Sequence, residues 1–303
     1  MGRPKRVVEF DVWGSRGSRS LIPAGSSLGN NTSCYSISNG HEVLAFDAGR
    51  GLAALAHAVR STARFRSVRT VHVLVSHSHV DHWEGLKDCD WLWHRNNGVH
   101  VRILGPRSAL AAIRSGFAHP HYVPLEILGE GTAASVEYLP LLPGTRKRVG
   151  AWSVEPWPLN HYTGSGQTTR FVDTLGYRAA LPGGPTVAYV SDHEPTAGTL
   201  ETEDSLLAGA GLALFDAHHM EARQHAYGHG SLEHSAEMAK RHPETLVLAG
   251  HHAPVCTDSD IRSGLRRHGK GLPNFALAVE GTTYVWDQRR RAFAAIERPR
   301  PRR

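Results

Sequence analysis

Four side chains of the kinds that can bind metals, three histidines and one aspartate, lie within six residues of this sequence, in the segment HSHVDH at 77–82. The segment directly follows VHVLVS (71–76), an apolar, β-branched run that predicts a buried strand. Imidazole nitrogens and carboxylate oxygens at such close spacing suit a divalent cation. A turn can aim His77 and His79 at one ion and Asp81 and His82 at a neighbouring ion. The alternative is a polar helix start, in which Asp81 caps a following helix and the histidines face solvent.

Other clusters of histidine and aspartate also follow predicted strands. LNHYTG places His161 after the strand-like AWSVEPWPL, YVSDHE places Asp192 after TVAYVS, and LVLAGHHAP places His251 and His252 after TLVLAG. In layered α/β proteins, the loops at the carboxyl ends of the strands converge on one crevice. A buried carboxylate such as Asp192 needs a cation or several donors. A lone histidine is more often an ordinary core or surface residue, so these segments point to a site only in combination with HSHVDH.

Short β-rich runs alternate with segments rich in Ala and Leu, and this pattern predicts an α/β fold. We expect strands near 7–13, 33–38, 42–46, 71–76, 99–105, 174–181, 186–191, 212–217 and 245–250. We expect helices near 51–61 and 81–93, after Pro106, and near 231–242. Residues 117–150 have the weakest pattern, which is compatible with a lid or substrate wall or with a plain surface connection.

The composition is that of a globular protein, with 303 residues of which 40% are hydrophobic. We expect one domain over 1–290 and a flexible, basic Arg/Pro-rich tail over 291–303. No apolar run approaches the roughly 18 residues that span a bilayer, and the basic N-terminus lacks the apolar core of a signal peptide. Three scattered cysteines indicate no disulfide framework. We therefore predict a cytoplasmic protein that does not contact membranes. The net charge of +6 is compatible with an anionic partner or with solvated ends.

HSHVDH resembles the signature of the metallo-β-lactamase superfamily, and the order of the later clusters agrees with it across most of 7–256. The resemblance implies an αββα sandwich, in which two mixed β-sheets are flanked by helices and metals bind at one edge. It also implies roles for three residues. His161 would be the third ligand of the first metal, Asp192 the bridging carboxylate, and His251 the last ligand of the second metal. His252 is the alternative candidate for the role of His251. We prefer His251 as the ligand and expect His252 to lie behind it.

A narrower resemblance links the sequence to the phosphodiesterase-like branch, which includes ribonuclease Z and small cyclic-phosphate phosphodiesterases. It rests on DVWGSRGSRSLIP, GNNTSCYSI, LAFDAGRGL and GHGSLEHSAEMA. By this match His229 would donate a proton to the leaving oxygen, and Asp47 would orient the HSHVDH loop. Alternatively, His229 merely precedes a helix capped by Ser231, and Asp47 is a turn residue. His218 and His219 depart from the family pattern, and so does His193 beside Asp192, which leaves the substrate pocket undefined.

The family implies a hydrolase in which a metal-bound hydroxide attacks the substrate and in which Asp81 and His229 are catalytic. Two divalent ions are expected, with zinc favoured and manganese or iron tolerated. We predict a small phosphodiester or cyclic phosphate as the anionic substrate. A lactone, thioester or amide is the alternative substrate, and a non-hydrolytic di-iron redox protein is a third interpretation. A nucleic-acid substrate is not favoured, because the long Gly/Pro-rich insertion with which ribonuclease Z holds tRNA is missing. The sequence is compatible with a homodimer but does not determine the oligomeric state.

Overall fold

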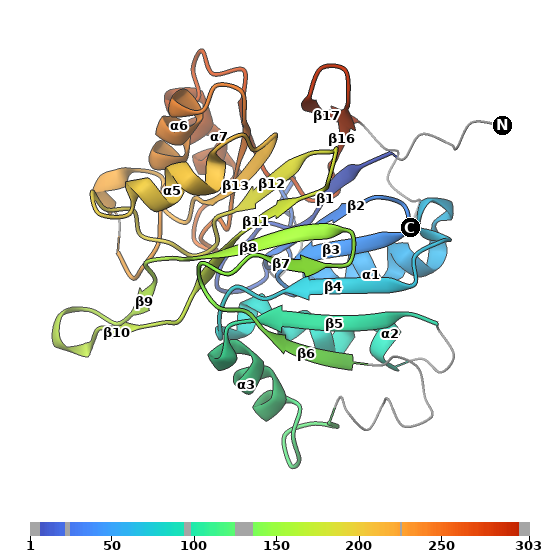
Figure 1. The fold of residues 1–303 in the computed structure, drawn as a ribbon. Coiled ribbons are helices and arrows are strands. Elements are labelled where there is room, and N and C mark those ends of the chain that lie inside the picture. The colour runs from blue at the N-terminus through green and yellow to red at the C-terminus, as the bar shows by residue number, and fades with distance from the viewer. Residues whose placement is uncertain (1–6, 22–24, 94–97, 125–135, 225, 297–303) are drawn as a thin grey trace.

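Two facing β-sheets form the centre of the computed structural model, which describes residues 7–21, 25–93, 98–124, 136–224 and 226–296 (Figure 1). In order across the first sheet, the strands are β17 (Ala292–Ile296), β16 (Thr283–Asp287), β1 (Glu9–Gly14), β2 (Cys34–Ser38), β3 (Glu42–Phe46), β4 (Thr70–Leu74), β5 (His100–Gly105) and β6 (Val136–Pro140). In order across the second sheet, they are β15 (Phe275–Leu277), β14 (Leu246–Gly250), β13 (Leu212–Asp216), β12 (Thr186–Tyr189), β11 (Leu175–Ala180), β8 (Trp152–Pro158) and β7 (Lys147–Val149). A separate hairpin of β9 (Tyr162–Thr163) and β10 (Arg170–Phe171) projects from the body.

Helices cover the outer face of each sheet, so the predicted αββα sandwich is confirmed (Figure 1). One apolar cluster joins the first sheet to the helices α1 (Gly51–Ser61), α2 (Asp90–Trp93) and α3 (Arg107–Gly116). Another joins the second sheet to α5 (Leu200–Leu207), α6 (Leu232–Arg241) and α7 (Asp258–His268). Between the sheets, side chains such as Phe10, Leu44, Trp152, Tyr177 and Leu212 are almost fully buried. Truncation of a buried leucine here to alanine would cost about 2–5 kcal/mol of unfolding free energy.

The strands that precede the predicted ligands all end at the same edge of the sandwich. In the first sheet β3 and β4 are parallel, and β1 runs in their direction because it pairs antiparallel with β2. In the second sheet β12, β13 and β14 are parallel, and β8 shares their direction because both β8 and β12 pair antiparallel with β11. The loops that follow these seven strands therefore meet in one region, as parallel topology requires.

The structure differs from the sequence prediction after the HSHVDH segment. A helix over 81–93 was expected, but this prediction is wrong: the chain forms two 3₁₀ turns, Val80–His82 and Glu84–Asp88, and only then the short α2. The backbone here bonds outside the segment, because the Gly85 nitrogen donates to the Ala48 carbonyl over 2.9 Å and the His82 carbonyl accepts from the Ala48 nitrogen over 2.7 Å. Asp81 and His82 therefore lie in a 3₁₀ turn at the edge of the sheets and not in an α-helix.

Six further strands appear among the described residues where the sequence predicted none, namely β6, β7, β9, β10, β15 and β16. Within the flexible tail predicted over 291–303, Ala292–Ile296 form β17 and pair with β16. Residues 297–303 lie outside the described residues, as do 125–135 of the segment predicted as a lid or connection. Within the described part of the chain, no helix has the length and apolar character needed to cross a bilayer.

Candidate metal centre

The loop after β4 carries the HSHVDH side chains into the interior. His77, Asp81 and His82 are buried, and His79 is half-buried at the rim. The loop is held at its start, because Ser76 donates from its backbone nitrogen to Asp47 Oδ1 over 2.6 Å and from its hydroxyl to Oδ2 over 2.9 Å. The predicted role of Asp47 in orienting this loop therefore agrees with its contacts.

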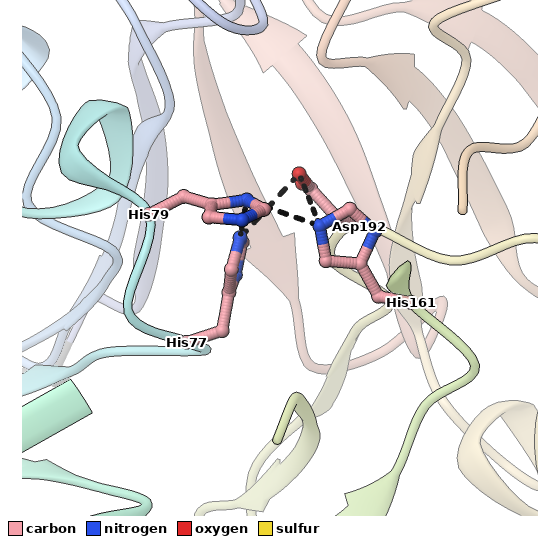
Figure 2. A group of neighbouring side chains, drawn as sticks. All are labelled: His77, His79, His161 and Asp192. Atoms are coloured by element: carbon pink, nitrogen blue, oxygen red, sulfur yellow. Dashed lines mark hydrogen bonds and ion pairs between the residues drawn. The ribbon is translucent and has the colours of Figure 1, made fainter. Parts of the chain in front are cut away.

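His77, His79, His161 and Asp192 form a first group whose polar atoms converge (Figure 2). His79 Nδ1 lies 2.9 Å from His77 Nε2 and 3.1 Å from His161 Nε2. Asp192 Oδ2 lies 3.6 Å from His77 Nε2 and 3.7 Å from His161 Nε2. Nitrogens that bind one zinc at about 2.0–2.1 Å lie within roughly 4 Å of each other. The first group therefore has the separations of a metal ligand set.

Asp81, His82 and His251 form a second group on the other side of Asp192. Asp192 Oδ1 lies 3.3 Å from His82 Nε2 and 3.3 Å from His251 Nε2. Asp81 Oδ2 lies 3.3 Å from His82 Nε2 and accepts a hydrogen bond from the Ser18 backbone over 2.9 Å. Each oxygen of Asp192 thus faces a different group, as expected of a bridging carboxylate.

Contacts behind the rings of His82, His161 and His251 leave the other nitrogen of each ring facing the centre. His82 Nδ1 donates to Asp47 Oδ2 over 2.6 Å, and His161 Nδ1 donates to the Gly228 carbonyl over 2.8 Å. His251 Nδ1 lies 3.1 Å from Ser33 Oγ. His82 Nε2 and His251 Nε2 are buried and have no hydrogen-bond partner among the described residues. Buried polar atoms without partners are costly, so these nitrogens fit a cation between them.

The charges around the centre also favour a cation. Burial, reinforced by the neighbouring His82, holds the pKa of His77 well below its usual value, so this ring is neutral at pH 7 and could bind a cation. Burial likewise lowers the pKa of His161 to about 4. Burial opposes charge on His82 too, but the carboxylates of Asp192, Asp81 and Asp47 outweigh it and raise the His82 pKa well above the usual value. The site therefore stabilises positive charge where Asp81, His82 and Asp192 meet.

His229 lies beside this centre and is paired with a carboxylate that the sequence analysis did not single out. Its Nδ1 donates to Asp216 Oδ2 over 2.9 Å and lies 3.8 Å from Asp192 Oδ2. Burial opposes the charged form of His229, but the Asp216 carboxylate raises its pKa to about 9. Asp216 ends the apolar strand LALFD, so the reasoning applied to Asp192 could also have found it.

The extra histidine His218 stacks on His229 and does not complete a third ion site. Asp216, His218, His229 and His251 are close enough to resemble a ligand set. However, the His218 and His229 rings stack at 4.2 Å between centroids with an interplanar angle of 13°. Parallel stacked rings cannot both direct in-plane lone pairs at one ion. His251 stacks on His229 as well, with centroids 5.3 Å apart, and the two contacts hold the imidazole of His229 in place.

A family profile described as the beta-lactamase superfamily domain matches residues 43–252, about two thirds of the chain. This chain belongs to the beta-lactamase superfamily. The resemblance inferred from HSHVDH is thereby confirmed. Comparison with curated protein sequences gave no significant match.

Solved structures share the superfamily fold over nearly the whole chain. The metallo-beta-lactamase fold protein YhfI from Bacillus subtilis is 16% identical, with a TM-score of 0.66 and coverage of 93% of this chain and 100% of that one. A diphosphatase from the PhnP family is 16% identical, with a TM-score of 0.62 and coverage of 92% and 97%. Human tRNase Z, short form, is 15% identical, with a TM-score of 0.58 and coverage of 91% and 98%. At these identities the likeness shows a shared fold.

Within this superfamily fold, two residues of the site adopt backbone conformations that are uncommon outside glycine. Asp47 has φ = 57° and His251 has φ = 54°. Such conformations cost about 1–3 kcal/mol and persist where the surroundings enforce them, often at functional sites.

His252 belongs to neither ligand group, and its Nδ1 lies 3.2 Å from the Ala217 carbonyl. His219 also stays outside both groups and lies 3.3 Å from the Ala226 carbonyl.

Proposed function

We propose that this chain is a dinuclear metal-dependent phosphodiesterase that hydrolyses a small phosphodiester or cyclic phosphate. One observation carries the proposal: the two oxygens of Asp192 face two separate ligand groups, with the His229–Asp216 pair alongside. In this assignment the first ion is held by His77, His79, His161 and Asp192. The second is held by Asp81, His82, His251 and Asp192.

Bound divalent ions would polarise a phosphoryl oxygen and lower the pKa of a water molecule. The nitrogen and oxygen donor set favours zinc, with manganese or iron as alternatives. The residues themselves supply orientation and proton transfer. Asp192 fixes the separation of the two ligand groups. Asp81, held by Ser18, is an acceptor that can orient the attacking water. As the P–O ester bond breaks, the leaving oxygen takes a proton from His229 Nε2, while Nδ1 stays bonded to Asp216.

An exposed cation near the site supports an anionic substrate. Arg19 belongs to the loop whose Ser18 contacts Asp81, and it lines a hollow of about 500 Å³ with Ser26, Thr257 and Ser259. An arginine there can attract phosphate oxygens. We extend the proposal to a cytoplasmic protein that acts on small molecules in preference to nucleic acid, and the chain is compatible with a homodimer.

The experiment is a substrate screen on protein loaded with zinc, manganese or iron. Bis-p-nitrophenyl phosphate, a p-nitrophenyl carboxylic ester and a lactone are offered in parallel, and His79→Ala serves as the matched inactive variant. We expect diester hydrolysis that His79→Ala nearly abolishes together with part of the metal content. Turnover of the ester or lactone alone would contradict the phosphodiesterase assignment, and oxygen uptake by an iron form without hydrolysis would contradict hydrolysis altogether.

A further inference from the structure

A buried carboxylate lies behind the centre and belongs to neither ligand group. Glu203 of α5 has a fully buried side chain. It accepts hydrogen bonds from His193 Nε2 over 3.0 Å and from His234 Nε2 over 2.5 Å, one on each oxygen. The Thr199 hydroxyl adds a third over 2.9 Å. Burying a carboxylate is costly. The burial of Glu203, with its oxygens fully paired with side chains from three segments, therefore needs a functional explanation.

His193 connects this carboxylate to the metal centre at three points. It directly follows Asp192 in the chain. Its Nδ1 accepts a hydrogen bond from the backbone nitrogen of Asn160 over 3.0 Å, and Asn160 directly precedes His161. Its own backbone nitrogen donates to Asp216 Oδ2 over 3.2 Å. A rotation of the His193 ring would therefore disturb the loops that carry Asp192 and His161.

The hydrogen bonds determine which nitrogen of His193 carries the proton. A backbone N–H can only donate, so Nδ1 of His193 must be unprotonated. The ring proton of the neutral imidazole then sits on Nε2 and needs an acceptor, which is Glu203 Oε1. Without that acceptor a buried N–H would be left unpaired, or the ring would change tautomer and lose the bond from Asn160.

We propose that Glu203 is a positioning residue of the metal centre, which holds His193 in its Nε2–H tautomer and thereby fixes the loops of Asp192 and His161. The inference rests on the metal-binding part of the proposed function and does not depend on the substrate. Partners that orient ligands from behind commonly change metal affinity by 10–100-fold when they are removed. A purely structural alternative exists, because Glu203 also ties α5 to α6 through His234.

The variants separate these roles. Glu203→Leu removes the acceptor, whereas Glu203→Gln keeps a carbonyl oxygen that can serve His193. His234→Phe removes the link between Glu203 and α6. Glu201→Gln changes an exposed acid on the same helix and is the matched control. His193→Phe removes the ring itself and leaves Glu203 bonded to His234.

Two readouts avoid turnover. Nitrogen-15 NMR of histidine-labelled, metal-free protein reports the tautomer of His193, whose signals are identified by their loss in His193→Phe. Competition between the protein and a chelator for cobalt, followed by its visible absorption, reports affinity and ligand geometry. We expect Glu203→Leu to lose the Nε2–H tautomer and to bind cobalt about 10–100-fold more weakly. Glu203→Gln, His234→Phe and Glu201→Gln should keep both.

The proposal is overturned if folded Glu203→Leu keeps the tautomer and the cobalt affinity, or if His234→Phe weakens cobalt binding as much as Glu203→Leu does. If Glu203→Leu does not fold, His193→Phe takes its place. His193→Phe must then bind cobalt about 10–100-fold more weakly than the parent protein, and unchanged affinity contradicts the proposal. A protein that binds cobalt in this way but cleaves no phosphodiester would leave the inference intact and contradict only the substrate assignment.

Discussion

At the scale of single residues, the account assigns proton donation to His229 and its orientation to Asp216. Replacing His229 by alanine should leave metal content intact, because neither ligand group around Asp192 needs this ring. Hydrolysis of diesters with poor leaving groups should fall by about 10²–10⁴-fold, while p-nitrophenyl diesters, whose leaving group needs no proton, should slow much less. Steady-state rates over a series of leaving groups test this prediction. His219→Ala, a neighbouring histidine outside both groups, is the control, and equal slowing of both substrate kinds would rule His229 out as the acid.

The residues predicted from the sequence are those whose local signal is strong. His77, His79, Asp81, His82, Asp192 and His251 each follow an apolar strand, and the structure brings them together. Glu203 could not be found in this way. In the segment TLETEDSLL it looks like Glu201 and Asp204, an ordinary charge on a helix. Glu203 is buried and Glu201 is exposed because α5 packs against the loop of His193. Packing between distant segments of this kind cannot be inferred from the sequence of one segment.

At the scale of elements, the loop after β1 supports the second ligand group by close packing. A Cβ on Gly17 would lie 2.5 Å from His251 Cδ2 and 2.6 Å from His251 Nε2. Gly17→Ala should therefore displace the His251 ring and lower metal affinity by at least about tenfold, as measured by chelator competition. Gly25→Ala in the same loop is the matched control, because a Cβ there meets nothing within 4 Å. Unchanged affinity in Gly17→Ala would mean that the loop yields and does not support His251.

Strand β4 contains His72, a buried histidine that lies away from the metal centre. Its burial predicts that the free energy of unfolding depends on pH. Burial lowers the pKa of His72 to about 4 from an ordinary value of 6.5, and both ring nitrogens are buried without a hydrogen-bond partner among the described residues. As the pH falls, His72 is protonated in the unfolded chain before it is protonated in the folded protein. This group therefore costs no stability above pH 6.5. Its cost grows as the pH falls towards 4 and reaches about 3 kcal/mol.

Urea unfolding between pH 7 and pH 4 measures this cost. His72→Leu should lose less stability over that range than the parent protein does, because the titrating group is gone. The exposed His57 of α1 provides the control, and His57→Gln should follow the parent curve. A His72→Leu variant that loses stability as steeply as the parent would contradict the assignment of this cost to His72.

The other differences between prediction and structure also belong to this scale. The chain after 256 was not assigned any strand, yet β15, β16 and β17 extend both sheets. The turn between β16 and β17 contains Arg289, Arg290 and Arg291, and this run of charge reads as the start of a tail. What joins β17 to the sheet is pairing with β16, which itself pairs with β1 at the opposite end of the sequence. Pairing between such distant segments could not be inferred from either segment alone.

At the scale of the whole molecule, the metal centre joins the two halves of the sandwich. His77, His79, Asp81 and His82 follow β4 of the first sheet, whereas His161, Asp192 and His251 follow β8, β12 and β14 of the second. A cation held from both sides should tie the sheets together at this edge. Ions that bind only the folded protein stabilise it, by about 4 kcal/mol when present at a thousand times their dissociation constant.

Chelation should therefore lower the melting temperature of the purified protein, and restoring zinc should reverse the change. Differential scanning calorimetry with and without a chelator measures this effect. His79→Ala, which removes one ligand, should respond less to the chelator than the parent protein. A melting temperature that does not depend on metal would contradict a cation shared between the sheets.

The most direct test is the metal content of protein purified from metal-replete growth, measured by inductively coupled plasma mass spectrometry together with the concentration of the chain. The account predicts two divalent ions per chain, falling towards one or fewer in His79→Ala and unchanged in His229→Ala. Protein that is folded but free of metal, and that takes up none when zinc, manganese or iron is added, would contradict it.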